Sequence, residues 1–279
     1  MATNTPFGQR LGLVLEGGAM RGIYTAGVLD VFLEAGIMPD VVVGVSAGAL
    51  HGCSYVAGQK GRSIRYYRKY RSDKHFMGLY SLLTTGDVVG TKFCYEDIPL
   101  RLDPFNEAAF EKAPVDFYVT VTNVRTGKPE YILCDELKVG SKMDVIRAGA
   151  SMPLCSKMVE WNGIPYAKMK DFGCRKSIVV LTQPAGYLKQ PAAMAPFEAM
   201  YRKYPAFVEA MRGRDQMYNT EVCAVEQAAK QGDVFLIRPS KLLHVGRMEH
   251  DIEVLNAQYE LGRQDARNQM DAMRERIER

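Results

Sequence analysis

The chain has 279 residues, a formal net charge of +4 and an apolar fraction of 47%. This length suits one large α/β domain with an ample core, and so mild a charge is not typical of a protein that binds nucleic acid. The six cysteines show no Cys-x-x-Cys spacing, which argues against zinc. We therefore expect a globular chain without a metal or another cofactor.

The first predicted strand, residues 11–15, leads into a glycine-rich loop from Glu16 to Gly22, and a helix follows over about 23–35. Glycine-rich backbone at the start of a helix presents several N–H groups outward, so the loop can hold a phosphate or an oxyanion. A nucleotide-binding turn is the alternative, because Gly-Gly-x-x-x-Gly is loosely similar to that fingerprint. Arg21 is unusual within it, however, and the next strand does not end in an acidic residue.

The second predicted strand, residues 41–45, runs into the sequence Gly44-Val45-Ser46-Ala47-Gly48 and then into a helix. A serine on a sharp strand-to-helix turn is presented at the helix N-terminus with its hydroxyl exposed, which is typical of a nucleophile. Gly44 and Gly48 are expected because the turn is too tight for a Cβ on either side. Neighbouring parallel strands would place Ser46 beside the glycine loop, as an oxyanion hole requires.

The rest of the chain alternates strands with helices, which predicts a mostly parallel central sheet with helices on both faces. Further strands are expected over 116–123, 129–133, 177–182 and 233–238, and a hairpin with an Asn-Gly turn over 159–166. Further helices are expected over 143–150, 196–212, 216–231 and 251–278. The loop 183–195 would lie at the C-terminal edge of the sheet.

The glycine loop and the serine turn together resemble the patatin-like phospholipase family. The resemblance covers about residues 10–185 and rests on residues 17–22, 24–29, 44–48 and 147–153. It implies a patatin-like three-layer α/β/α fold in a single domain over 1–279, with a core of about 10–240 and a C-terminal helix of about 251–278. It also implies a serine acyl hydrolase that cleaves fatty-acyl esters of phospholipids or related lipids, without a metal.

The resemblance also implies roles for individual residues. Ser46 would accept the acyl group, and Gly17, Gly18, Ala19 and Arg21 would form the oxyanion hole. The base would be the aspartate of a Ser-Asp dyad, which takes the proton of the serine hydroxyl. In the family this aspartate lies in an Asp-Gly-Gly or Asp-Gly-Ala motif that follows a hairpin strand.

Asp171 is the candidate for this base, because Asp171-Phe172-Gly173 is the only Asp-x-Gly between the hairpin and the strand 177–182. That interval has ten residues, however, whereas a parallel crossover alone needs about a dozen. The favoured interpretation therefore places Asp171 at the end of the crossover helix, with the aspartate loop missing after Tyr166. Without a base, the chain would bind lipid or acyl groups and not cleave them. A histidine triad is a weaker alternative, since no local pattern supports one.

The first residues are polar and no apolar run is long enough to cross a bilayer, which predicts a cytoplasmic protein with reduced thiols. Membrane contact would be peripheral and would involve residues 62–76, the basic segment, in which Arg and Lys alternate with Tyr and Phe. One interpretation of this segment is a solvated helix face. The other is a lid or interfacial patch that meets anionic headgroups.

Overall fold

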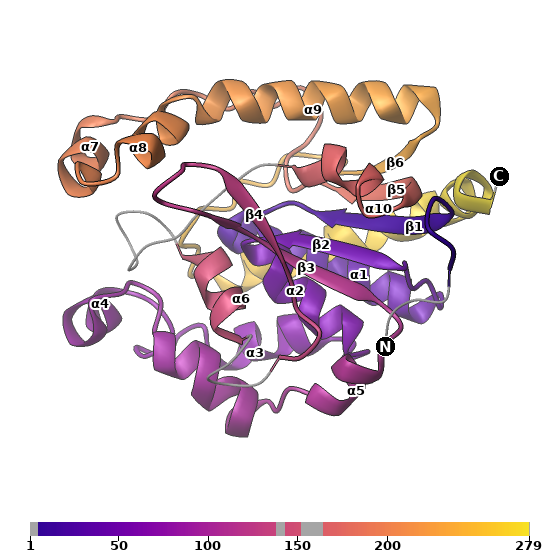
Figure 1. Cartoon of the computed structure of the whole chain (residues 1–279). Coiled ribbons are helices and arrows are strands. Elements are labelled where there is room, and N and C mark those ends of the chain that lie inside the picture. The colour runs from indigo at the N-terminus through magenta and orange to yellow at the C-terminus, as the bar shows by residue number, and fades with distance from the viewer. Residues whose placement is uncertain (1–4, 138–142, 152–163, 279) are drawn as a thin grey trace.

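One sheet separates two layers of helices in the computed structural model, which describes residues 5–137, 143–151 and 164–278 (Figure 1). Its strands are β1 (Arg10–Leu15), β2 (Val41–Val45), β3 (Asp116–Thr122), β4 (Pro129–Leu133), β5 (Cys174–Val180) and β6 (Val234–Ile237). Their order is β4-β3-β2-β1-β5-β6, and among these pairs only β3 and β4 run antiparallel. The predicted α/β/α architecture with a mostly parallel sheet is confirmed.

The central strands β1 and β2 are apolar on both sides because helices cover both. Leu13 and Leu15 of β1 belong to the buried cluster on one face, and Val14 belongs to the cluster on the other. All three side chains are fully buried. A strand that is covered on both faces has a continuous apolar sequence, which is why these two strands are predicted so clearly.

One face of the sheet is covered by α9 (Arg214–Gln231) and the short 3-10 helix η3 (Pro165–Lys170), as Figure 1 shows. The hairpin predicted over 159–166 lies mostly outside the described residues, and its end enters η3 and not a strand. Pro165 opens this helix, where its missing N–H is not needed. The N–H of Ile164 donates to Glu221 of α9 at 2.7 Å, which fixes the turn into η3.

Four helices cover the other face of the sheet, and the predicted C-terminal helix is one of them. They are α1 (Ile23–Glu34), α2 (Ala47–Val56), α6 (Met143–Ala150) and α10 (Ile252–Glu278). The cluster beneath the sheet contains Leu13 of β1, Phe32 of α1 and Met273 of α10, each almost or wholly inaccessible to solvent. The C-terminal helix therefore belongs to the main core.

The helices α1 and α10 approach each other at two glycines. A Cβ on Gly27 would lie 2.1 Å from the Tyr259 carbonyl oxygen, and one on Gly262 would lie 2.1 Å from that of Tyr24. The same two tyrosines donate hydrogen bonds across the interface, from the Tyr24 hydroxyl to Asp265 at 3.0 Å and from Tyr259 to Asp30 at 2.5 Å. The contact is therefore reciprocal, because each helix contributes one glycine, one tyrosine and one aspartate to it.

The remaining helices lie around this core. They are α3 (Arg62–Tyr70), α4 (Leu79–Thr85), the π-helix η2 (Phe93–Leu102), α5 (Glu107–Lys112), α7 (Ala195–Tyr201) and α8 (Pro205–Arg212). The prediction of one helix over 196–212 is wrong, because the chain leaves the helical conformation at Tyr204 (φ −127°, ψ 68°) and Pro205 begins a new helix. No helix in the described residues combines the length and the apolar content that crossing a bilayer requires.

Candidate active site

Ser46 occupies the turn between β2 and α2 in a conformation that serine rarely adopts. Its backbone has φ 51° and ψ −121°, and among the described residues Ala19 is the other non-glycine residue with positive φ. Strained backbone of this kind persists where the surrounding fold enforces it, often at functional sites. The side chain is 5% exposed, so the hydroxyl faces a cavity and not the open solvent that the sequence led us to expect.

The two glycines of the turn have no room for a side chain. A Cβ on Gly44 would lie 2.5 Å from the Ala49 Cα atom, and one on Gly48 would lie 2.4 Å from the Leu15 carbonyl oxygen. Both obstacles are backbone, so they cannot move aside as a flexible side chain would. The helix α2 therefore begins in direct contact with the end of β1.

The glycine loop lies against this turn. The parallel pairing of Leu15 with Gly44 brings the ends of β1 and β2 level, so the chain segments that follow them meet. The loop then enters the 3-10 helix η1 (Ala19–Gly22), in which the Arg21 N–H donates to the Gly18 carbonyl at 3.0 Å. A Cβ on Gly22 would lie 2.6 Å from the Ala47 Cβ. The structure thus brings together the glycine loop and Ser46.

A buried carboxylate, Glu16, holds the start of this loop, and the sequence analysis did not identify it. Its oxygens accept hydrogen bonds from the Thr182 N–H, from the Thr182 hydroxyl at 3.0 Å and from the Tyr218 hydroxyl at 2.8 Å. Glu16 is 4% exposed. These bonds tie α9 and the chain just after β5 to the first residue after β1, which makes Glu16 a positioning residue for the loop. An acidic residue directly after an apolar strand was the available signal.

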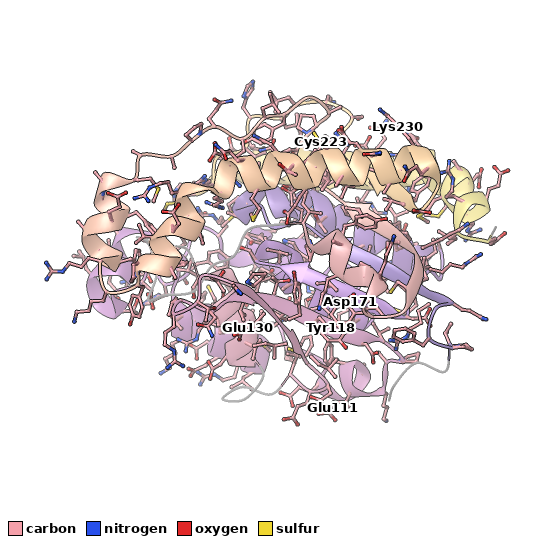
Figure 2. The ribbon with its side chains drawn as sticks, turned by 45° about the horizontal axis from the view of Figure 1, so that its top comes forward. Glu111, Tyr118, Glu130, Asp171, Cys223 and Lys230 are labelled. Atoms are coloured by element: carbon pink, nitrogen blue, oxygen red, sulfur yellow. The ribbon has the colours of Figure 1, made fainter. Side chains whose placement is uncertain are left out.

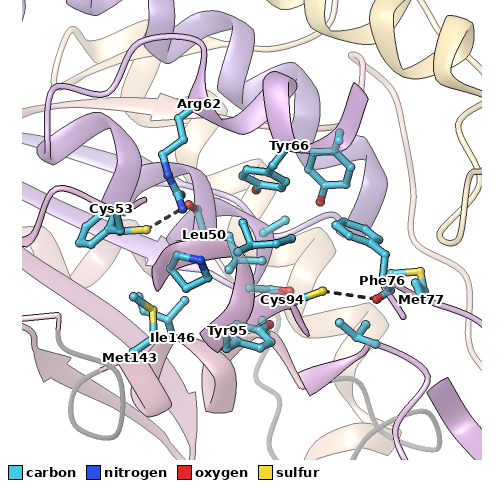
Figure 3. A pocket seen from close by; sticks show the side chains of 18 of the residues that line it. Leu50, Cys53, Arg62, Tyr66, Phe76, Met77, Cys94, Tyr95, Met143 and Ile146 are labelled. Atoms are coloured by element: carbon cyan, nitrogen blue, oxygen red, sulfur yellow. Dashed lines mark hydrogen bonds between the residues drawn. The ribbon is translucent and has the colours of Figure 1, made fainter. Parts of the chain in front are cut away.

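An apolar cavity opens beside Ser46 and is walled by α2, α3, η2 and α6 (Figure 3). Ser46, Ala19 and Met20 form the part of its lining nearest the glycine loop. Most of the other lining side chains are aliphatic or aromatic, among them Leu50, Tyr67, Phe76, Tyr95, Ile98, Phe105, Met143 and Ile146. Such a lining suits a hydrocarbon chain and excludes water from the serine.

The thiols that line this cavity are not reactive nucleophiles. Cys53 donates to the Leu50 carbonyl at 3.1 Å and Cys94 donates to the Phe76 carbonyl at 3.3 Å, as the dashed lines in Figure 3 mark. Burial raises the pKa of both thiols, to about 12 for Cys94. Both therefore stay protonated at neutral pH and contribute apolar wall.

His51 lies on α2 and is packed in the interior. Its Nδ1 is 3.0 Å from the Ser63 hydroxyl oxygen, and the residue is 1% exposed. Burial lowers the pKa of His51 to about 4, so the ring is neutral at pH 7. A Cβ on Gly22 would lie 3.4 Å from its Nε2, which places the ring against the end of η1. His51 supports the glycine loop by packing.

Positive charge gathers on the α9 side of the glycine loop. Asn219 holds the backbone of Lys189 through two hydrogen bonds, at 2.8 Å to its N–H and 3.1 Å to its carbonyl. The Lys189 ammonium lies 4.3 Å from the centre of the Tyr218 ring. Burial, together with three nearby arginines, lowers the pKa of Lys189 to about 8, although the nearby Glu16 carboxylate acts in the opposite direction. The arginines are Arg214, Arg247 and Arg21.

The structure does not bring Asp171 to Ser46. Asp171 ends η3 just before β5, whereas Ser46 follows the C-terminal end of β2, so the two lie at opposite edges of a parallel sheet. The length of β5 separates these edges by about 20 Å. The Asp171 side chain is 62% exposed and pairs with Lys168 at 2.7 Å, near the position labelled in Figure 2. The assignment of Asp171 as the dyad base is corrected accordingly.

Replacing Asp171 by asparagine is therefore expected to leave hydrolysis of a short p-nitrophenyl ester unchanged within about twofold. Loss of a general base in contact with the serine would instead cost about 10²–10⁴-fold. The measurement is the steady-state rate of the Asp171→Asn variant beside wild type. A fall of about 100-fold or more would restore Asp171 as the base.

Part of the basic segment is packed into the protein. Arg65 donates to the Asp103 carboxylate at 2.7 Å, and Arg62, which is 6% exposed, lies 3.6 Å from the same carboxylate. Arg71 is buried and donates to the Glu249 carbonyl at 2.7 Å. Arg62 and Arg71 are thus engaged in the interior, whereas Arg65, Arg68 and Lys69 are exposed on α3, as the interpretation of a solvated helix face expects.

Glu221 of α9 makes the stability dependent on pH. Burial raises the pKa of Glu221 from 4.5 to about 7, so the folded chain holds this proton more tightly than the unfolded chain does. The stability that Glu221 contributes is therefore present below about pH 4.5 and is lost as the pH rises through about 7. Glu221→Gln, which mimics the protonated form, is expected to match wild type near pH 5 and to be more stable by about 2 kcal/mol near pH 8.

Thermal unfolding of both proteins at the two pH values checks this expectation. Glu253→Gln, at an exposed position of α10, is the matched control and should unfold as wild type does at both values. Parallel pH curves for Glu221→Gln and wild type would contradict the assignment of a raised pKa to Glu221.

Comparison with known proteins adds two family matches. The model of the patatin-like phospholipase family matches residues 13–168, and that of a domain of unknown function (DUF6363) matches residues 204–278. The protein YjjU of Escherichia coli (strain K12) is 26% identical over 273 residues, which cover 91% of this chain and 75% of YjjU.

Fungal lysophospholipases are also similar to the chain. Lysophospholipase nte1 of Aspergillus terreus is 29% identical over 155 residues, which cover 54% of this chain and 10% of that protein. Lysophospholipase nte1 of Aspergillus fumigatus is 28% identical over 155 residues, with the same two shares. The chain thus spans three quarters of the length of YjjU and a tenth of that of these fungal proteins.

Proposed function

The chain belongs to the patatin-like phospholipase family, and from this premise we propose that it is a lipid acyl hydrolase whose nucleophile is Ser46. The observation that carries the proposal is the position of Ser46. It lies on a strained turn, in contact with a glycine-rich loop, and it lines an apolar cavity. A nucleophile, donors for an oxyanion and room for a hydrocarbon chain thus meet at one place.

In this proposal the Ser46 Oγ atom attacks the carbonyl carbon of a fatty-acyl ester. The ester C–O bond breaks, the alcohol leaves with a proton, and an acyl-Ser46 intermediate forms. Water then attacks the same carbonyl, releases the fatty acid and restores the serine hydroxyl. The negative charge of each tetrahedral intermediate needs N–H donors beside Ser46.

The glycine loop is proposed to supply these donors. The Arg21 N–H is already donated to Gly18 within the loop, so the amides of Gly17, Gly18 and Ala19 are the better candidates. Arg21 would then act through its positive charge. The N-terminus of α2 adds to the field at Ser46, because the dipole of a helix is positive at that end.

The substrate is proposed to be a phospholipid or lysophospholipid. The cavity suits the acyl chain, and the cations around Lys189 on the opposite side of the glycine loop suit an anionic phosphate. The names of the fungal relatives favour a lysophospholipid. We further propose that residues 1–279 form one domain, since α10 packs along α1 in the main core.

The proposal is tested by labelling with a fluorophosphonate, which traps an activated serine as a covalent adduct. The adduct is expected on the peptide that contains Ser46, and Ser46→Ala should remove it. Ser72→Ala, at an exposed position of similar chemistry, should label as wild type does. Absence of labelling under conditions in which a control hydrolase reacts would overturn the hydrolase assignment.

A second function, binding of an acyl group without turnover, is favoured by one observation. Asp171 lies at the opposite edge of the sheet from Ser46. A chain that acylates but does not turn over would release a single equivalent of p-nitrophenol from an activated ester. Continuous release above background is the result expected of the hydrolase.

A further inference from the structure

A short loop that carries α4 projects from the wall of the cavity. We call residues 77–89 the α4 loop. An isolated bridge between Met77 and Val89 closes it, and the Gly78 N–H donates to the Val88 carbonyl at 2.8 Å. Figure 1 shows α4 standing away from the other helices, on the side of the molecule where α7 and α8 also lie. The loop is therefore a defined protrusion with a narrow base.

The large apolar side chains of α4 are exposed. Leu79 is 70% exposed and Leu83 is 77% exposed, while Tyr80 and Leu82 are 41% and 39% exposed. Within α4 only Ser81 is buried, and its hydroxyl bonds back to the Asp87 carbonyl at 2.7 Å inside the same loop. A helix normally buries its apolar side chains. A helix as short as α4, with seven residues, is not stable by itself in water. The exposed leucines therefore call for an apolar environment outside the chain.

The base of the α4 loop is part of the cavity that Ser46 lines. Met77 and Val89, the two bridged residues, both belong to the lining. Phe76, which precedes them, lines the same cavity and is 4% exposed. An apolar surface thus continues from the exposed leucines of α4 to the neighbourhood of the serine.

The charged residues beside the α4 loop indicate which apolar environment its leucines meet. No charged residue lies between His75 and Asp87, and the cations beside the loop, Lys74 and Lys92, are exposed. The Lys74 ammonium lies 4.5 Å from the centre of the Tyr80 ring. Leucines at the tip with lysine and tyrosine behind them are the pattern of a segment that lies in a lipid–water interface.

We propose that the α4 loop inserts its leucines into a lipid surface that bears anionic headgroups. The Ser46 cavity then opens toward that surface along Met77 and Val89. This docking surface adjoins the basic segment at Lys74, and it rests on the proposed function only for the statement that lipid enters the cavity.

The test measures partition onto vesicles in the Ser46→Ala background, so that no lipid is cleaved. The vesicles are phosphatidylcholine alone or an equimolar mixture with phosphatidylglycerol, and bound protein is separated by sedimentation. The double substitution Leu79→Asp and Leu83→Asp is expected to weaken partition onto the mixed vesicles by at least about 50-fold, because it removes two leucines from the apolar phase. Lys74→Glu should weaken only the preference for the anionic vesicles.

The matched control is the pair Leu188→Asp and Leu242→Asp, at positions 62% and 55% exposed elsewhere on the molecule. Its partition should equal that of the parent protein. Equal partition of the α4 variant and the parent would overturn the proposal. So would a change from dimer to monomer on α4 substitution with partition unaltered, since α4 would then join two copies of the chain. Fluorophosphonate labelling of Ser46 is read separately, so failure of the hydrolase assignment leaves the partition result intact.

Discussion

Ester hydrolysis is expected to fall by at least about 10³-fold when Ser46 is replaced by alanine, because the atom that forms the covalent intermediate is removed. The fold should survive the change. Ala19 already holds φ 47° in this chain, so alanine tolerates a positive φ here. The steady-state rate with a short p-nitrophenyl ester and the melting temperature are measured together.

Ser72→Ala serves as the control for this prediction and should retain the wild-type rate. A Ser46→Ala protein that is as active as wild type would place the nucleophile elsewhere. A variant that is inactive and also unstable would be replaced by Ser46→Cys, whose thiol should react with the ester more slowly than the wild-type serine yet still form an acyl adduct at this position.

Gly262→Val is expected to cause the largest loss of stability, about 3 kcal/mol or more, which corresponds to a fall in melting temperature of about 8 °C. The new Cβ would lie 2.1 Å from the Tyr24 carbonyl oxygen, so α10 has to move away from α1. That movement also strains the buried bonds from Tyr24 to Asp265 and from Tyr259 to Asp30. Both helices then lose packing against the same core.

Ala257→Val is the matched control, since it adds the same side chain at an exposed position of α10. It should cost no more than about 0.7 kcal/mol, from helix propensity alone. Calorimetry of both variants also tests whether the chain is a single domain. One cooperative transition that moves as a whole is expected, whereas an early separate transition in Gly262→Val would mean that the C-terminal segment unfolds by itself.

The features that the sequence predicted well are those specified by neighbouring residues. The strands β1 and β2 are short apolar runs, and Gly44 of the serine turn follows from local crowding by Ala49. The helix α10 shows its amphipathic pattern over many turns. Each of these needs no knowledge of what lies elsewhere in the chain.

The features that it missed depend on partners far away in the sequence. Glu16 is a site residue only because Thr182 and Tyr218, more than 160 residues further on, bond to it. The ion pairs of Arg62 and Arg65 were missed because their acceptor, Asp103, lies about 40 residues further on. Asp171 matched a motif, but the sheet topology carries it to the wrong edge. The spacing had favoured a position of Asp171 at the end of the crossover helix. The ten residues between the predicted hairpin and the next strand are too few for both an aspartate loop and a helix.

Because β5 lies beside β1, the segment matched by the phospholipase family cannot be excised with its sheet intact. That segment, residues 13–168, ends before β5 begins, although β5 pairs with β1 at six positions. Cut out alone, it would keep only Leu13–Leu15 of β1, expose these apolar residues as an unprotected edge and leave Glu16 without its donors. An edge of that kind recruits other chains, so the isolated segment should aggregate. The segment that the family model matches is thus a sequence unit but not a folding unit.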